Sequence, residues 1–207
     1  MSGTTTVGRR RRADGERRRM SILSAAARLA TVEGIDGLSI GRLAEEIGMS
    51  KSGLYAHFGS KQELQLATID TTRGIFIEVV SRPALAAPRG VERLRALCRR
   101  FLDHVDQQVF PGGCFFAAVA AEVAARPGEV RDRIAREQLD WIGMLERLVT
   151  EAQELGELTP ETDPAQLAFE LNALVVAANT AFVLHADPAG LERAERAVDR
   201  VISAASP

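Results

Sequence analysis

The sequence has few of the residues on which most metal and redox sites depend. It contains only two cysteines, Cys98 and Cys114, and three histidines among 207 residues. Two cysteines exclude a disulfide-built scaffold and a cysteine-based zinc finger, and no Cys, His or acidic residue lies at ligand spacing from His57. We therefore expect no metal and no cofactor. With no signal peptide ahead of the cysteines, we expect a cytoplasmic location.

Alternating strand patterns longer than a few residues are also lacking, as are internal repeats. The uncharged stretch from Leu171 to His185 has 15 residues, fewer than the roughly 20 that a membrane-spanning helix needs. Proline and glycine separate helical stretches instead, so the sequence predicts an all-α fold of about nine helices. After the N-terminal region, these stretches are expected at about 89–109, 113–125, 128–155, 163–186 and 189–205.

The net charge of −2 hides an uneven distribution. Residues 1–61 carry 11 Lys and Arg against 6 Asp and Glu, whereas the remainder carries 15 against 22. A basic N-terminal third on an acidic body favours contact of one end with a polyanion. The run from Arg9 to Arg12 has no apolar partners, which predicts a disordered basic arm over residues 1–14 that adds phosphate contacts.

Residues 15–65 have the pattern of a small DNA-binding head. Ser39 offers an N-cap hydroxyl to a short amphipathic helix, which ends at a tight turn at Gly48. Ser50 can cap the third helix, and a fourth begins near Ser60 and continues to about residue 80 as a linker. The first helix is expected from about Gly15 to Glu33. Two short helices joined by a tight turn are typical of the helix-turn-helix, which places its second helix in a DNA groove.

The second helix of this motif carries the residues that we expect to read DNA. Lys51 and Ser52 lie in its first turn, the part that reaches base edges in the major groove. Gly53 lets the backbone approach the DNA closely. Tyr55 and His57 follow later in the helix, where they can donate to flanking phosphates. Sequence preference is therefore expected to come from Lys51 and Ser52.

The segment GMSKSGLYAHFGSKQEL, residues 48–64, resembles the signature of the TetR family of bacterial transcriptional regulators when taken with Ser39-Ile40 and Leu43-Ala44 before it. The likeness covers about residues 17–65. It implies a homodimer of nine-helix chains, a palindromic operator, and a small molecule that binds the second domain and releases the DNA. The protein is accordingly expected to be a repressor and not an enzyme.

Two positions depart from the family pattern. Ser52-Gly53 reverses the usual order of glycine and small residue, and Gly41 lacks a side chain where many members place a polar reader. Base reading is therefore expected to depend on Lys51, Ser52 and Arg42. The DNA-contacting positions assigned from the helix pattern and the resemblance are Ser39, Arg42, Ser50, Lys51, Ser52, Gly53, Tyr55, His57 and Lys61.

Residues 85–207 follow a boundary marked by Pro83, Pro88 and Gly90, and the resemblance implies that they form a helical ligand-binding and dimerisation domain. Bulky aromatic residues and a thiol gather in residues 110–116, near the expected entrance of the ligand cavity. An apolar cavity with a few polar groups suits a small organic ligand, with core packing the alternative for each residue. The candidates are His104, Phe110, Cys114, Phe115, Phe116, Trp141, Met144, Phe169, Asn172, Asn179 and Phe182.

Cys114 permits two other interpretations. A helix N-terminus stabilises a thiolate, so Cys114 could sense electrophiles or oxidants, whereas burial among phenylalanines would oppose this. A Cys114–His104 pair could be the nucleophile and base of a helical enzyme. No orienting third residue or oxyanion loop accompanies that pair, which makes the enzyme the remote alternative.

The two C-terminal helical stretches carry more apolar surface than one small domain obviously needs. They could fill the core of a monomer, or pair with the same helices of a second chain as a four-helix bundle. For the second arrangement we predict a two-fold interface centred on Leu174, Ala178, Phe182, Val198 and Val201.

Overall fold

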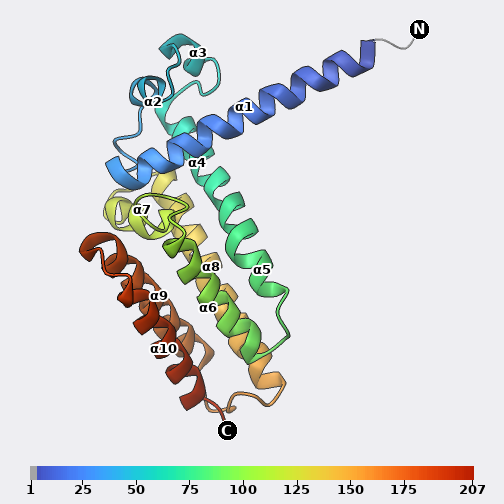
Figure 1. Ribbon diagram of the computed structural model, residues 1–207, viewed down its shortest axis with the longest axis vertical. Helices are drawn as coiled ribbons and strands as arrows, with labels where there is room; N and C mark the ends of the chain where they lie inside the picture. Colours follow the sequence, from blue (N-terminus) through green and yellow to red (C-terminus); the bar gives the residue numbers. More distant parts are fainter. Residues whose placement is uncertain (1–3) are drawn as a thin grey trace.

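The computed structural model consists of helices and turns throughout the part that it describes, namely the backbone of residues 4–207 and the side chains of residues 14–207. A small head lies at one end of a longer body of aligned helices, and α1 crosses the junction between them (Figure 1). The predicted all-α fold is confirmed. The elements are α1 (Thr4–Glu33), α2 (Ile40–Glu46), α3 (Lys51–Tyr55), α4 (Lys61–Phe76), the π-helical turn η1 (Ile77–Ser81), α5 (Arg82–Leu85), α6 (Val91–Asp106), α7 (Phe115–Val123), α8 (Glu129–Glu154), α9 (Pro164–His185) and α10 (Ala189–Ala204).

Helix α1 begins at Thr4 and not near Gly15. Its backbone is therefore helical over residues 4–14, where the sequence led us to predict a disordered arm. Arginine is a good helix former and no proline interrupts this stretch, so nothing local ends the helix. Residues 1–3 and the side chains of Arg9 to Arg12 lie outside the described part. The N-terminal half of α1 projects away from the body (Figure 1).

Three serine N-caps define the short helices of the head. The side chains of Ser39, Ser50 and Ser60 each accept a hydrogen bond of 3.1 Å from the backbone amide three residues later. These bonds satisfy amides that have no partner within the helix. Gly48, with φ of 64°, makes the turn between α2 and α3. The core below them comprises Ile22, Leu23, Ala26, Leu29, Leu38, Ile40, Leu43, Ala44, Leu54, Phe58 and Leu64.

Pro83 does not end the linker helix, contrary to the boundary predicted there. Helix α4 continues directly into η1 and then into α5, which ends at Leu85. Pro83 lies near the start of α5, where its missing amide hydrogen removes a single backbone bond, and the wider π-helical turn before it accommodates the ring. The linker thus reaches residue 85 and not 80. Gly90, with φ of 92°, precedes α6.

Two further apolar clusters lie outside the head. In the body, α6, α8, α9 and α10 pack around fully buried leucines such as Leu94, Leu97 and Leu145. A junction cluster joins the head to the body through α1, α4, α7 and α8. Its buried members are Ala27, Ala30, Ile35, Ile69, Phe110, Phe115, Val119, Val123 and Ile134. The head therefore rests on a continuous apolar joint.

Helix α9 is 22 residues long, seven more than the uncharged stretch in the sequence, and is apolar enough by composition to cross a membrane. One face of it packs against α8 and α10 in the body core, as core helices of the same composition do. Only 33% of its most apolar window is buried, however. Helix α9 thus packs against α6, α8 and α10 and still leaves one side exposed.

Candidate functional site

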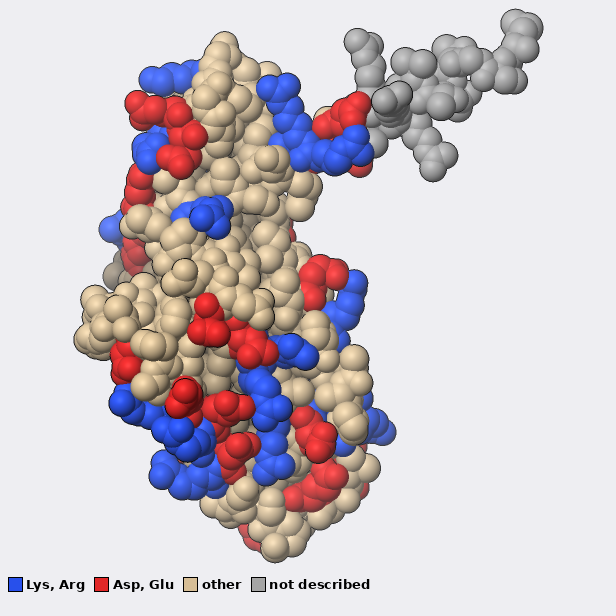
Figure 2. Space-filling view, viewed as in Figure 1, with Lys and Arg blue, Asp and Glu red and all other residues tan. Residues whose placement is uncertain are grey.

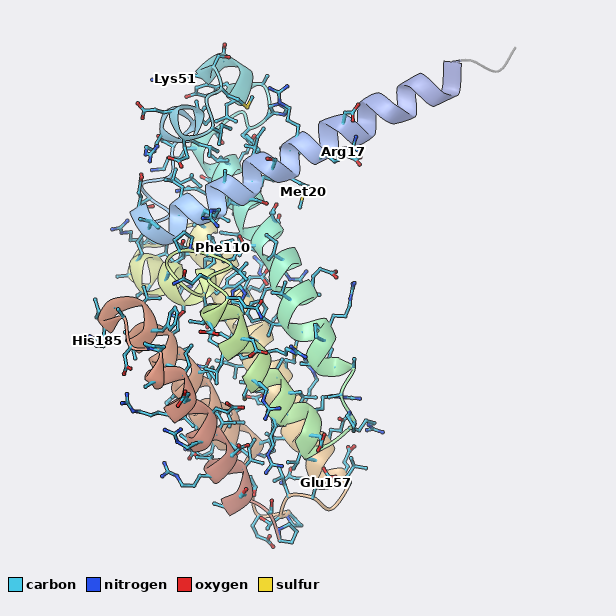
Figure 3. All side chains as sticks on the ribbon, viewed as in Figure 1. Arg17, Met20, Lys51, Phe110, Glu157 and His185 are labelled. Carbon is cyan, nitrogen blue, oxygen red and sulfur yellow. The ribbon has the colours of Figure 1, made fainter. Side chains whose placement is uncertain are left out.

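The first turn of α3 presents Lys51 and Ser52 to solvent. Both side chains are exposed, and Lys51 lies at the far tip of the head (Figure 3). Leu54 and Phe58 anchor the opposite face of this segment in the head core. The Ser50 cap and the two buried anchors therefore fix which face of α3 points outward.

Two other predicted contacts lie beside this face. Tyr55 is 56% exposed and His57 is exposed, so both can reach an outside partner. The backbone carbonyl of His57 accepts a hydrogen bond of 3.1 Å from the Arg19 guanidinium, which also lies 4.5 Å from the centre of the Phe58 ring. Sequence reasoning missed Arg19, although the run of arginines at residues 17–19 was a signal. Figure 2 shows basic groups at the tip of the head and along the visible part of α1.

Gly41 and Gly53 both make room for their neighbours. A Cβ on Gly41 would lie 3.4 Å from Cε of Lys51, so the Lys51 stem occupies the space that a side chain would need. A Cβ on Gly53 would lie 3.0 Å from Oγ of Ser50, which is the cap of the same helix. Gly41 has no side chain that could contact a base, and the Lys51 side chain instead extends over this position of α2.

Arg42 and Lys61, the other two basic residues among the predicted DNA contacts, have partners within the chain. The Arg42 guanidinium donates to Glu33 at 2.7 Å and to Glu46 at 3.0 Å, and these hydrogen bonds raise the pKa of Arg42 further. Lys61 donates through Nζ to the carbonyl of Asp36 at 2.6 Å. Arg42 and Lys61 would have to exchange these bonds to contact DNA.

A cavity lies in the body, below the head, with about 670 Å³ of space between its lining atoms, part of which is open to solvent. Helices α4, α6, α7, α8 and α9 and the turn η1 all contribute to its wall. Five of the predicted ligand residues line it, namely Cys114, Phe116, Trp141, Met144 and Asn172. The sequence missed the rest, which are Arg73, Phe76, Ile77, Ser81, Phe101, Ala117, Glu137, Gln138, Asp140 and Val176.

The other predicted ligand residues lie elsewhere. His104, Phe110 and Phe115 are buried in the packing around the cavity. Asn179 is buried and its side-chain oxygen accepts a hydrogen bond of 2.8 Å from the amide of Cys114. Phe182 packs partly buried against the body core, and Phe169 is 64% exposed on the outside of α9. These six residues do not line the cavity.

Four aromatic rings form much of the cavity wall. Phe76 stands nearly perpendicular to Phe101, Phe116 and Trp141, with ring centres 6.2, 6.1 and 5.5 Å away. The Trp141 indole donates to the side-chain oxygen of Asn172 at 3.0 Å. These contacts fix the rings, so the space between them is preformed.

Charged groups lie at one side of the same cavity. Nε of Arg73 lies 3.0 Å from a carboxylate oxygen of Glu137, whose side chain is 11% exposed. Burial raises the pKa of Glu137, Arg73 opposes the rise, and nearby Asp140 adds to it. Two carboxylates and one guanidinium therefore line a space whose other walls are mainly apolar.

Burial shifts the pKa values of Cys114 and His104 in directions that oppose both the thiol-sensing and the enzyme hypotheses. Burial raises the pKa of the Cys114 thiol to about 11, although the backbone amides of Ala117 and Phe116 act in the other direction. Burial also lowers the pKa of His104 to about 4. A reactive thiolate beside an imidazole needs the opposite shifts. Among the described residues, no group of three or more His, Cys, Asp or Glu could hold a metal.

Neither thiol should react with iodoacetamide at neutral pH while the protein is folded. Only about one Cys114 in ten thousand would be ionised at pH 7, because its pKa is near 11. Mass spectrometry after alkylation should find both cysteines unmodified in the native protein and modified in denaturant. An added thiol at exposed Ala125, in the variant Ala125→Cys, provides the reactive control. Rapid native labelling of Cys114 would restore the thiol-sensing hypothesis.

The head and the body are joined by hydrogen bonds around one loop. Glu122 of α7 accepts from the amides of Ile35 and Asp36, at 2.8 and 2.9 Å. Asp36 also pairs with Arg126, and its carbonyl is the group that Lys61 binds. The loop after α1 is therefore held between α7 and the start of α4. Helix α7 also contributes to the cavity wall, so this one helix connects the loop to the cavity.

The predicted dimer residues do not share an exposed face. Ala178 and Val198 are 4% and 3% exposed inside the body core, so they are wrong as contacts with a partner. Leu174, Phe182 and Val201 are partly buried against the same core. Helix α9 instead exposes an uncharged stripe on its outer side, made by Phe169, Ala173, Ala177, Thr180 and Leu184.

Comparison with known proteins covers both parts of the chain. Residues 22–68 match the family described as "Bacterial regulatory proteins, tetR family", and residues 90–198 match "Tetracyclin repressor-like, C-terminal domain". The chain is 26% identical to the transcriptional regulator AcuR of Cereibacter sphaeroides over 151 residues, which are 72% of this chain and 68% of that protein.

Two solved structures are similar over almost the whole length. A TetR transcriptional regulator from Chloroflexus aurantiacus is 25% identical with a TM-score of 0.85, covering 92% of this chain and 96% of its own. The structure of AibR in complex with isovaleryl coenzyme A and operator DNA is 27% identical with a TM-score of 0.70, covering 92% and 98%.

Proposed function

The chain belongs to the tetR family of bacterial regulatory proteins, and on that premise we propose that it is a cytoplasmic repressor that binds a palindromic operator as a homodimer and is released when a small molecule fills the body cavity. The family is one of DNA-binding transcriptional regulators. The observation that carries the proposal is the exposed first turn of α3, where Lys51 and Ser52 project from a helix fixed by its cap and its buried anchors.

Different residues of the head would contact the bases and the phosphates of the DNA. Lys51 can donate to guanine acceptors in the major groove, and Ser52 can serve several bases. Tyr55, His57 and Arg19 lie beside this face, where they would contact phosphates and position the head. The basic N-terminal part of α1 would add further phosphate contacts without adding sequence information.

Replacing Lys51 by alanine should cost roughly 1–3 kcal/mol on the best operator and relax the preference for one or two base pairs. The operator would be selected from random DNA by the wild-type protein, and binding measured by fluorescence anisotropy on that site and on single-base variants. Tyr55→Phe is the matched control, because a lost phosphate contact weakens all sites equally. A Lys51→Ala protein with unchanged affinity and preference would remove Lys51 from base reading.

The second copy of the chain would bind to the uncharged stripe on α9. Two copies related by a two-fold axis would bring Ala173 and Ala177 of each chain together, with Phe169 and Leu184 covering the ends. This pairing would bury the apolar surface that the single chain leaves exposed on α9. It also leaves both heads outside the interface, as binding to two half-sites requires.

Release of DNA would follow the contacts from the cavity to the head. A ligand between Phe76, Phe116 and Trp141 presses on α4 and α7 together, since both helices line the cavity. Helix α7 holds the loop after α1 through Glu122, and α4 holds it through Lys61. A shift of either helix therefore displaces the head through directly bonded groups.

A further inference from the structure

The chemistry of the cavity wall indicates which class of ligand it would take, given the proposed function of the cavity as an effector site. Phe76, Phe101, Phe116 and Trp141 give it aromatic surfaces on several sides. The faces of aromatic rings carry partial negative charge and attract cations. The same surfaces also cover an apolar ligand body.

The two carboxylates in the wall can still accept hydrogen bonds from a ligand. Glu137 is almost buried, and its ion pair with Arg73 joins it to a guanidinium that is 51% exposed. Among the side chains that the structure describes, no donor makes a hydrogen bond to Glu137, whereas Asp140 is exposed, without an ion pair or a hydrogen bond, and is hydrated. Glu137 is the carboxylate that is largely removed from water, and a ligand can supply it with hydrogen-bond donors in addition to Arg73.

We propose that the cavity binds an organic cation, namely a protonated primary amine carried on an aromatic or branched apolar body. The ammonium group would donate to Glu137 and Asp140 beside the aromatic rings, while the apolar body fills the space lined by Met144 and Val176. An anion would instead meet two carboxylates and a single arginine that is already paired.

The main rival is an acyl thioester such as the isovaleryl coenzyme A bound by AibR. Its acyl group would fit an apolar space, but its phosphates need several cationic partners. Arg73 is the only Lys or Arg among the residues that line the cavity. The charge of the wall therefore favours the amine over the thioester.

Three probes of one skeleton test the charge directly: biphenyl-4-ylmethanamine, biphenyl-4-ylmethanol and biphenyl-4-carboxylate. Each would be titrated into the full-length protein at neutral pH by calorimetry, with the fluorescence of Trp141, the single tryptophan of the chain, reporting occupancy of the cavity. The amine should bind roughly tenfold more tightly than the alcohol, and the carboxylate most weakly, as expected for a charge-assisted hydrogen bond.

Variants on α8 assign the preference to the cavity carboxylates. Glu137→Gln should remove most of the difference between amine and alcohol while leaving the affinity for the alcohol nearly unchanged. Asp140→Asn should reduce the difference to a smaller extent. Glu146→Gln is the matched control, because Glu146 lies on the same helix but outside the cavity. Thermal unfolding of each variant would check that the fold is intact.

Equal binding of the amine and the alcohol would overturn the inference, as would failure of all three probes to bind. Tighter binding of the carboxylate or of isovaleryl coenzyme A, with a response of Trp141, would also overturn it but leave the cavity as the effector site. Operator binding and the Lys51→Ala result need no ligand, so they test the proposed regulator separately.

Discussion

Glutamate in place of Ala177 should convert the proposed dimer into a folded monomer that no longer binds its operator. Ala177 is exposed at the middle of the uncharged stripe on α9, so a single chain can accept a charge there. In a two-fold dimer the substitution brings two carboxylates into one apolar interface, where neither has a partner. Loss of the second head should lower operator affinity by roughly 100-fold or more. Light scattering and anisotropy would measure both effects.

Two glutamate variants serve as controls for this result. Ala125→Glu changes an exposed alanine between α7 and α8 and should leave the dimer and operator binding intact. Val198→Glu places a charge in the body core, where Val198 is 3% exposed, and should unfold the chain instead of dissociating it. If the Ala177→Glu protein is dimeric and has full operator affinity, the proposed interface on α9 is wrong.

Sequence predicted the head almost element by element because its signals are local. Ser39, Ser50 and Ser60 each precede a short amphipathic helix, and each caps the helix expected of it. Gly48 makes the expected turn with a positive φ. The family resemblance depended on the same residues and is confirmed. The roles of Lys51 and its neighbours in DNA binding remain predictions.

The cavity and the dimer face were harder to predict, for a physical reason. Helix α9 is apolar nearly all round, so its pattern could not show that Ala178 faces the core while Ala177 faces solvent. Ser81 lies at the end of the π-helical turn of the linker, which rotates later residues relative to a regular α-helix. Periodicity identifies apolar faces, but only tertiary packing decides which of them border a cavity.

An alanine at Gly112 should loosen the joint between head and body and destabilise the protein by about 3 kcal/mol or more. The amide of Gly112 donates to Oγ1 of Thr31 at 3.2 Å, which places the loop before α7 directly against α1. A Cβ on Gly112 would lie 2.0 Å from the backbone carbonyl oxygen of Thr31. Because the obstacle is the backbone of a helix and not a flexible side chain, α1 and the loop must separate.

Gly74→Ala is the matched control for this prediction. A Cβ on Gly74 would meet nothing within 4 Å, and the residue lies exposed within α4. Alanine should therefore stabilise that helix by up to about 1 kcal/mol through its higher propensity. Urea unfolding would measure both variants, and hydrogen exchange would show whether Gly112→Ala exposes the amides of Ile35 and Asp36 that Glu122 holds. Equal stability of the two variants would mean that α1 and the loop can separate without cost, and the joint could not then transmit a shift of α7 to the head.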